Sequence, residues 1–221
     1  MSASNRYQDP EELFDLAGAD GTPLGRAKSR AAVHRDGDWH RALHVWVYGE
    51  RDTGPFMIFQ RRGLSKDTNP GALDATVGGH FGAGESLQDV MREVQEEIGI
   101  PADLPAMRKA GVRICASEKD HGAVDRELQD VFLWRRDEPL AGYRPNTPEL
   151  EGLAEARLTD VLAISAGTLE ALPAQFLNAA GLEIEPVSFG RDCFVPAIDR
   201  YIYRVAIAIQ STLRGEEHVA I

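Results

Sequence analysis

Three glutamates, Glu93, Glu96 and Glu97, lie in one short segment that runs from Arg92 to Ile100. On an α-helix each residue advances by about 100°, so these side chains would share one side of a single turn. Like charges at such spacings repel each other, and Arg92 is the only cation next to them. Carboxylate and carbonyl oxygens are the ligands that hard divalent cations prefer. The segment therefore predicts a magnesium or manganese site.

A glycine-rich loop from Gly79 to Glu85 precedes the predicted helix. Ser86 can serve as the N-cap of the helix, and Gly99 followed by Pro101 would end it. The apolar residues fall on a different stripe from the glutamates, so that stripe can face a core. It consists of Leu87, Met91, Val94 and Ile98.

The loop and the helix together resemble the signature of the Nudix hydrolases. Gly79 and Glu85 match its start, and the segment from Arg92 to Ile100 matches its end in residue type and spacing. One difference is that the connecting segment, Ser86 to Met91, is one residue shorter than in the family pattern.

This resemblance implies roles for the matched residues. Glu93, Glu96 and Glu97 would bind Mg²⁺ or Mn²⁺, together with the backbone carbonyl of Gly79. Glu85 would pair with Arg92 and orient the glutamate turn.

A second resemblance covers more of the chain. The run from Phe59 to Arg62, the Pro70-Gly71 pair and the Gly78-Gly79-His80 motif are similar to the Nudix branch nearest to isopentenyl-diphosphate isomerase. Those isomerases hold a metal with histidines and glutamates, so the resemblance implies a second metal site here. By motif, its ligands would be His34, His40, His80, Asp125 and Glu127.

The isomerases also need a cysteine two residues before the motif histidine, and here Gly78 occupies that place. Cys115 and Cys193 are the only cysteines, and neither is close to the motif in sequence. A proton donor to an alkene is therefore missing, while the hydrolytic glutamate turn is complete. Both observations favour hydrolysis over isomerisation.

Most Nudix sites use a further acid from outside the signature, either as a metal ligand or as a general base. Glu127 is the first choice, because it matches an isomerase ligand and lies at the start of a predicted strand; Glu149 is the second. The alternative for Glu127 is a solvated strand end within a charged run. The residues expected to act in catalysis are therefore Glu96, Glu97 and Glu127.

Basic side chains upstream of the glycine loop could bind the phosphate oxygens of a substrate. They are Arg61, Arg62 and Lys66. Because Arg61 and Arg62 alternate faces at a strand end, at most one of them points inward. Aromatic side chains that could stack on a base are Trp39, Trp46 and Phe81, but the place of Trp46 in an alternating strand favours core packing for it.

The net charge of the chain argues against some kinds of binding partner. A net charge of −11 disfavours a large nucleic-acid footprint or an anionic membrane surface. A bound cation can invert the local charge, however, and admit a small diphosphate substrate. The start lacks an apolar signal core, and no apolar run approaches the ~20 residues that span a bilayer. We expect a cytoplasmic protein that binds a small molecule and has no nucleic-acid or membrane partner.

Short β-rich segments with helices at both ends predict an α/β fold. Strands are expected at 14–16, 41–48, 56–60, 73–77, 112–116 and 128–134, and helices from about 159, at 168–180 and at 197–213. The Nudix resemblance implies an α/β/α sandwich with a mixed β-sheet. The expected organisation is an amino-terminal extension at 1–38, a Nudix hydrolase domain at 39–165 and a helical carboxy-terminal extension at 166–221 packed on the same domain. Tyr201, Val205 and Ile209 recur at helical spacing, which is typical of a core stripe or of a homodimer interface.

The expected function is that of a metal-dependent hydrolase that cleaves a phosphoanhydride bond in a nucleoside diphosphate derivative or a similar small diphosphate. One alternative is an enzyme like isopentenyl-diphosphate isomerase. The other is a non-catalytic Nudix module that binds a metabolite, and the complete set of glutamates argues against it.

Overall fold

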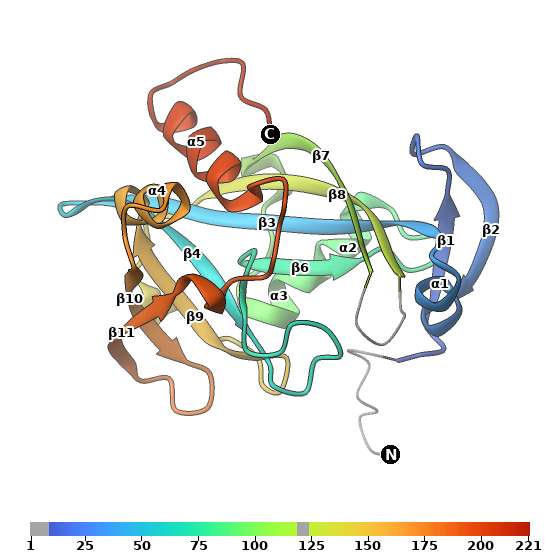
Figure 1. Cartoon of the computed structure of the whole chain (residues 1–221), viewed down its shortest axis with the longest axis horizontal. Helices are drawn as coiled ribbons and strands as arrows, with labels where there is room; N and C mark the ends of the chain where they lie inside the picture. The colour runs from blue at the N-terminus through green and yellow to red at the C-terminus, as the bar shows by residue number, and fades with distance from the viewer. Residues whose placement is uncertain (1–8, 119–123) are drawn as a thin grey trace.

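A mixed β-sheet of 11 strands organises the computed structural model, which describes residues 9–118 and 124–221 (Figure 1). The strands are β1 (Leu13–Ala17), β2 (Pro23–Ser29), β3 (Trp39–Arg51), β4 (Gly54–Arg62), β5 (Leu73–Asp74), β6 (Val77–His80), β7 (Met107–Glu118), β8 (Val124–Arg135), β9 (Leu150–Arg157), β10 (Ala171–Asn178) and β11 (Ile184–Gly190). The helices are α1 (Arg30–Asp36), α2 (Leu87–Val90), α3 (Arg92–Ile98), α4 (Leu158–Ala166) and α5 (Tyr201–Leu213). Short 3₁₀ turns are η2 (Leu104–Ala106), η3 (Leu140–Gly142) and η4 (Arg191–Cys193).

The long strand β3 is the centre of the sheet. Along one edge it runs parallel to β8 from Trp39 to Tyr48. Along its other edge it pairs in turn with β1, β6 and β4, all antiparallel. Strand β7 extends the sheet beyond β8, and β9, β10 and β11 extend it beyond β4. Because side chains alternate along a strand, β3 contributes to both faces of the sheet.

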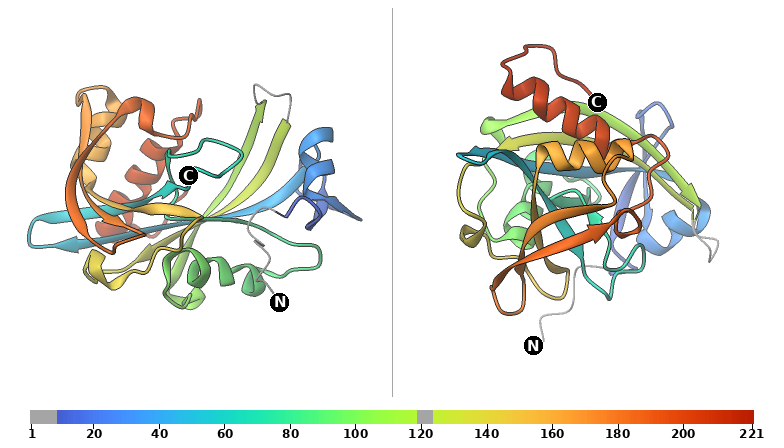
Figure 2. Two further views of the ribbon diagram at one scale, coloured as in Figure 1. Left: turned by 90° about the horizontal axis from the view of Figure 1, so that it is seen from below. Right: turned by 60° about the vertical axis from the view of Figure 1, so that its left-hand side comes forward.

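A separate hydrophobic core covers each face. Trp46 on β3 belongs to the core beneath α4 and α5, whereas its neighbours Val45 and Val47 belong to the core beneath α2 and α3. Figure 2 shows the two pairs of helices on opposite sides of the sheet. The expected stripe of Tyr201, Val205 and Ile209 on α5 is buried in the first of these cores. This arrangement is the mixed α/β layering that the sequence predicts.

The amino-terminal elements fold against the start of β3. Leu16 and Ala17 of β1 pair with His40 and Trp39, and Phe14, Leu16 and Val33 form a small third core. This packing brings α1, and with it His34, beside the central strand.

The expected helix at 168–180 is wrong, because the chain there forms β10 between β9 and β11. Its buried residues Leu172, Ala174 and Phe176 alternate with less buried ones, which is the period of a strand. Alanine, leucine and glutamine favour helices, but hydrogen bonding to two neighbouring strands outweighs this weak preference. Strand β11 follows, so the region 166–221 is helical mainly in α5.

The single strand expected at 73–77 is also wrong, because two short strands occupy this region. Strand β5 pairs with β4, whereas β6 pairs with β3. Between them, the hydroxyl of Thr76 accepts a hydrogen bond from Val47 N at 2.9 Å and donates one to the carbonyl of Ile58. The chain thus passes from pairing with β4 to pairing with β3 at Thr76. There a side-chain hydroxyl takes the place of backbone hydrogen bonds between the strands.

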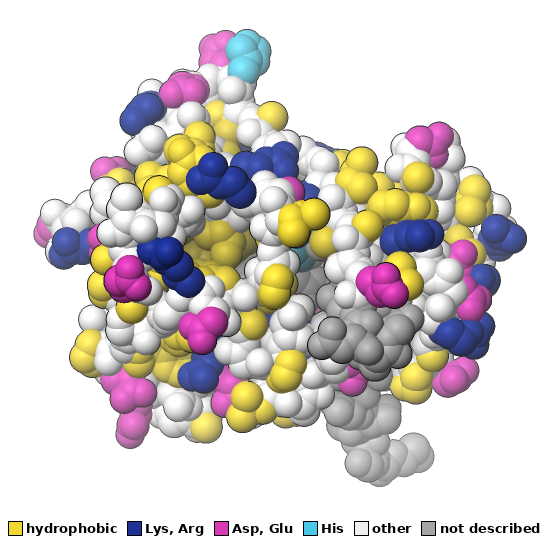
Figure 3. All heavy atoms as spheres, in the orientation of Figure 1, with side chains coloured by type: hydrophobic (Ala, Val, Ile, Leu, Met, Phe, Trp, Pro, Cys, Tyr) yellow, Lys and Arg dark blue, Asp and Glu magenta, His cyan; other side chains and the backbone are white. Residues whose placement is uncertain are grey.

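Lys and Arg side chains are interspersed with acidic ones on the face shown in Figure 3. Among the described helices, none is long and apolar enough to cross a membrane.

The end of α3 offers a test of the fold. Gly99 has φ 76°, and a Cβ there would lie 2.4 Å from the Cβ of Arg144, whereas Gly84 has φ 77° with no atom within 4 Å. We expect Gly84→Ala to lower the free energy of unfolding by about 1 kcal/mol, the cost of a left-handed alanine. Gly99→Ala should lower it by at least about 2 kcal/mol, because a clash is added. Urea unfolding of both variants measures the difference, and equal losses would contradict the close packing at Gly99.

Candidate active site

The glutamate-bearing segment folds as two short helices with a break at Met91. Ser86 caps α2 as predicted, since its hydroxyl accepts from the Asp89 N–H while the Asp89 carboxylate accepts from the Ser86 N–H. The break lies in the segment that is one residue shorter than the family pattern. Met91, Val94 and Ile98 are nevertheless buried in the core beneath α3, so the predicted apolar stripe is confirmed.

Arg92 joins the acidic side chains of this segment. Its guanidinium lies 2.8 Å from Glu85, 3.1 Å from Glu93 and 4.0 Å from Glu96. The predicted pair between Glu85 and Arg92 therefore forms in spite of the shorter connection. Glu85 also accepts a hydrogen bond from the Gly82 N–H at 2.8 Å, which ties the glycine loop to the helix.

Helix α3 packs directly against β6, and the glycines of β6 permit this contact. A Cβ on Gly79 would lie 2.5 Å from the Cγ of Glu93. The Glu97 carboxylate accepts a hydrogen bond from the Gly78 N–H at 3.0 Å and another from Gln60 Nε2 at 3.4 Å. Glu97 thus joins α3, β6 and β4.

Buried carboxylates accumulate at this junction. Burial raises the pKa of Glu93 to about 8 and that of Glu149 to about 7, and it raises the pKa of Glu97 well above its usual range. Lys66 Nζ lies 3.7 Å from Glu149 and offsets part of this charge. Glu149 Oε1 is buried without a hydrogen-bond partner in the described part of the protein. Oxygen ligands with too little positive charge around them fit a divalent cation.

Glu96 differs from the other two glutamates of the turn. Its side chain is 40% exposed, whereas Glu97 is buried. Within residues 9–118 and 124–221, Glu93, Glu96 and Glu97 do not form a group whose ligand atoms all lie within 4.8 Å of one another. The structure therefore places Glu93 and Glu97 at the junction and Glu96 at its solvent side.

The histidines implied by the isomerase resemblance assemble on the other face of β6. Ligand atoms of His34, His40 and His80 lie within 4.8 Å of one another, and so do those of His40, Asp125 and Glu127. Nε2 of His34 and Nε2 of His40 are buried and have no hydrogen-bond partner among the described residues. Ring nitrogens without partners beside carboxylates fit a bound metal ion.

Burial sets the charge state of this cluster. It lowers the pKa of His34 to about 4 and of His80 to about 3, and it also lowers the pKa of His40. The rings are therefore neutral near pH 7, the form in which imidazole binds metals. Burial acts to raise the pKa of Glu127, but the hydrogen bond that its carboxylate accepts from His80 Nε2, at 3.0 Å, outweighs burial and holds that pKa well below its usual range.

Glu127 was expected to assist the glutamate turn, but its hydrogen bonds are to His80 and Gln129. Outside the signature, Glu149 is the acid whose charge raises the pKa of both Glu93 and Glu97. Strand register explains this difference, because Glu127 lies opposite His40 on β3 and therefore faces the histidines. Glu127 is 9% exposed, so the alternative of a solvated strand end is wrong.

A cavity of about 700 Å³ opens beside the histidine cluster. Arg62 lines it and is held by Asp74 at 3.1 Å, whereas Arg61 points toward the rings of Phe176 and Phe189. One arginine of the pair therefore faces the cavity, as the alternation predicts. Lys66 lies instead beside Glu149.

The aromatic candidates for base stacking are largely in the cores. Trp46 is fully buried beneath α5, and Phe81 is buried in the core beneath α3. Trp39 lies at the start of β3 and is half-buried. Core packing is therefore the role of Trp46 and Phe81.

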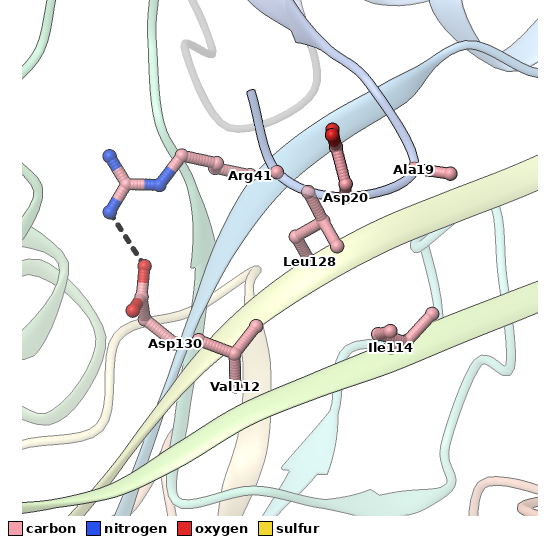
Figure 4. Close-up of a pocket in the computed structure, with 8 residues that line it drawn as sticks. Ala19, Asp20, Arg41, Val112, Ile114, Leu128 and Asp130 are labelled. Carbon is pink, nitrogen blue, oxygen red and sulfur yellow. Dashed lines mark hydrogen bonds and ion pairs between the residues drawn. The ribbon is translucent and has the colours of Figure 1, made fainter. Parts of the chain in front are cut away.

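A different hollow, of about 330 Å³, lies on the opposite face of the same strands (Figure 4). Leu128 and Asp130 line it, because they alternate along β8 with Glu127 and Gln129, which line the cavity. Arg41 forms an ion pair of 2.6 Å with Asp130 there. Its lining residues include none of the predicted metal ligands.

Sequence reasoning missed His44, Arg113 and Gln129, which also line the cavity. His40 and His44 lie on the same face of β3, because side chains alternate along a strand. This alternation would have placed His44 beside the predicted ligand His40. Arg113 and Gln129 face each other across β7 and β8 at 2.9 Å, a pairing that only the register reveals.

The raised pKa of Glu93 leads to a prediction for the metal-free protein. In a chelator, the folded state binds more protons than the unfolded chain between the ordinary glutamate pKa of 4.5 and about 8, so stability should fall as pH rises through this range. We expect Glu93→Gln to remove part of this fall, by at most about 1.4 kcal/mol per pH unit. Urea unfolding at several pH values measures it, and Mg²⁺ should restore the stability of the wild type more than that of the variant. Equal pH slopes would contradict the buried charge of Glu93.

Comparison with known proteins places this geometry in a family. The NUDIX domain matches residues 38–178. A protein of Clostridium acetobutylicum named as an uncharacterized Nudix hydrolase is 32% identical over 153 residues, which are 68% of this chain and 72% of that protein. An isopentenyl-diphosphate Delta-isomerase of Streptomyces avermitilis is 32% identical over 140 residues, covering 62% of this chain and 67% of the isomerase. The crystal structure of DR0079 from Deinococcus radiodurans shares the fold, with a TM-score of 0.50, 21% identity and coverage of 71% of this chain and 90% of that one. With its glutamate helix packed on the glycine strand of a mixed sheet, the chain belongs to the Nudix family of hydrolases.

Proposed function

We propose that this Nudix hydrolase uses Mg²⁺ or Mn²⁺ to cleave a phosphoanhydride bond in a nucleoside diphosphate derivative or a similar small diphosphate. The supporting observation is the junction of α3 and β6, where Glu97 and Glu149 are buried, Glu93 is partly buried, and all three have raised pKa values. A cation would balance this charge, and carboxylate oxygens are the ligands that magnesium prefers.

Each residue of the junction has a role in this proposal. Glu93 and Glu97 would hold the metal with the Gly79 carbonyl, and Glu96 would complete the set from the solvent side. When bound, the metal would neutralise diphosphate charge and acidify a water. The pair of Glu85 and Arg92 would keep the turn in place.

Glu149 is the proton acceptor in this proposal. A metal ion bound at the junction would keep the Glu149 carboxylate ionised and therefore able to accept a proton. Its Oε1 atom lacks a hydrogen-bond partner among the described residues and is available to a water. Water would attack phosphorus, Glu149 would take its proton, and the bond from phosphorus to the leaving oxygen would break.

The first experiment is product release from a panel of nucleotide sugars, dinucleoside polyphosphates, nucleoside triphosphates, coenzyme A and isoprenoid diphosphates, with Mg²⁺ or Mn²⁺. We expect Glu97→Gln to lower kcat by at least about 100-fold, because it removes a buried group that holds the metal. Gln95→Ala is the matched control, since Gln95 is exposed on the same helix. Tight binding of a panel compound without turnover by the wild type would favour the non-catalytic binding module.

The choice between Glu149 and Glu127 as base is tested by pH profiles. If Glu149 accepts the proton, kcat should rise with pH through the pKa that Glu149 has in the metal-loaded enzyme, and Glu149→Gln should abolish this rise and lower kcat by at least about 100-fold. Glu127→Gln should leave the shape of the profile intact. A profile that loses its rise in Glu127→Gln instead would assign the base to Glu127.

Isomerisation of isopentenyl diphosphate is the second candidate function. The histidine set with Glu127 is assembled, and Cys115 lines the same cavity as the cross-strand partner of Glu127. A thiol distant from the motif in sequence is thus close to it in space. Formation of dimethylallyl diphosphate by the wild type and its loss in Cys115→Ser would support this function. Hydrolysis without isomerisation would exclude it.

A further inference from the structure

His44 faces the cavity from β3, directly opposite the glycine that replaces the isomerase cysteine. His44 and Gly78 are partners in the pairing of β3 with β6. A Cβ on Gly78 would lie 3.6 Å from Nε2 of Gln60, and 3.7 Å from Cδ2 and 3.8 Å from Nε2 of the His44 ring. Both residues line the cavity. The imidazole edge therefore lies against the space that a side chain at position 78 would fill.

The hydrogen bonds of Tyr201 determine where His44 carries its proton. Trp46 Nε1, which can only donate, lies 2.9 Å from the Tyr201 hydroxyl oxygen. His44 Nδ1 lies 3.0 Å from the same oxygen. These are the two hydrogen-bond partners of this hydroxyl in the described part of the chain. The hydroxyl accepts from Trp46, so its own hydrogen is satisfied by donation to Nδ1. The proton of a neutral His44 is then on Nε2, which faces the cavity.

Tyr201 is itself held in place. The guanidinium of Arg113 stacks over the Tyr201 ring at 4.0 Å. Arg113 donates two hydrogen bonds to the Asp199 carboxylate, at 2.8 Å and 2.9 Å, and a third to Gln129 at 2.9 Å. The first turn of α5 is thereby fixed to β7 and β8. A ring fixed in this way positions the His44 imidazole with little freedom.

The charge of the site suits a neutral donor. Burial lowers the pKa of His44, so the ring stays uncharged near neutral pH. Three arginines line the cavity together with five carboxylates, so an anionic ligand there would bind together with a cation. An N–H group that has no acceptor in the described structure and faces such a cavity is a ready donor to a phosphate oxygen.

We propose that His44 Nε2 donates a hydrogen bond to a phosphate oxygen of the diphosphate bound in the cavity, and that Tyr201 is the positioning residue that keeps the proton on Nε2. This inference rests on the proposed function for its ligand class. It goes further in naming a substrate-binding residue outside the Nudix signature and a role for α5.

The first part of the test concerns the proton. ¹⁵N NMR of the wild-type imidazoles should show His44 protonated at Nε2. Tyr201→Phe removes the hydroxyl and should change the Nδ1 signal and mix the two tautomers. Tyr203→Phe, on the same helix, is the matched control and should leave His44 unchanged. A His44 protonated at Nδ1 in the wild type would overturn the proposal.

The second part concerns the ligand, with methylenediphosphonate and Mg²⁺ as the probe, because its P–C–P bridge resists hydrolysis. We expect the probe to shift the His44 Nε2 signal and His44→Leu to weaken binding at least about 10-fold, the effect of losing a hydrogen bond to a charged group. His44→Gln, whose amide N–H can reach the same place, should recover part of this loss. An unchanged Kd in His44→Leu, or no binding by the wild type, would overturn the proposal. A protein that binds the probe through His44 but hydrolyses nothing in the substrate panel would refute the hydrolase function alone.

Discussion

The direct contact between α3 and β6 at Gly79 is the constraint on which the site depends. A side chain at this position would overlap Glu93 and push the helix away from the sheet. The helix would then withdraw Glu97 from the Gly78 N–H and from Gln60. The same contact excludes water from the carboxylates and so produces the raised pKa values of the junction. Gly79 of the signature therefore acts through packing, because it lets α3 approach β6 closely.

Strand β6 separates two chemically different surfaces. Gly79 faces the glutamates of α3, and the next residue, His80, faces the histidine cluster. Gly78 belongs to both, because its N–H is bonded to Glu97 while its open side lies against His44. The cavity is lined by Gly78 and Gly79 but not by Glu93, Glu97 or Glu149.

Much of the local structure was predictable, because it depends on neighbours in sequence. The cap at Ser86, the apolar stripe through Val94 and the pair of Glu85 with Arg92 are all encoded within a few residues. The histidine set was implied by family resemblance. Its members come together only because α1, which carries His34, packs beside β3. The helix predicted at 168–180 was wrong because the structure there depends on long-range contacts. Strand β10 pairs with β9 and β11 along its two edges, and its helix-favouring composition does not show this.

The same limit applies to the roles of single residues. Glu127 and Glu149 are both acids that follow turns or charged runs, and only register separates the acid beside the histidines from the one beside the glutamates. His44 lies in a strand that reads as hydrophobic core, and its significance depends on Tyr201, 157 residues later. Such pairings are set by the tertiary structure.

The alternation along β8 has a consequence for how this protein can evolve. Glu127 and Gln129 face the cavity while Leu128 and Asp130 face the hollow behind it, and β8 is paired on both edges, with β3 and β7. Inserting or deleting one residue here would exchange the two sets of side chains and place leucine among the histidines. The side chains that β8 presents can therefore change by substitution, whereas an insertion or deletion within the strand would disrupt both surfaces. New specificities in this lineage should accordingly arise in loops and at single positions such as 44 and 78, while the spacing of β8 stays fixed.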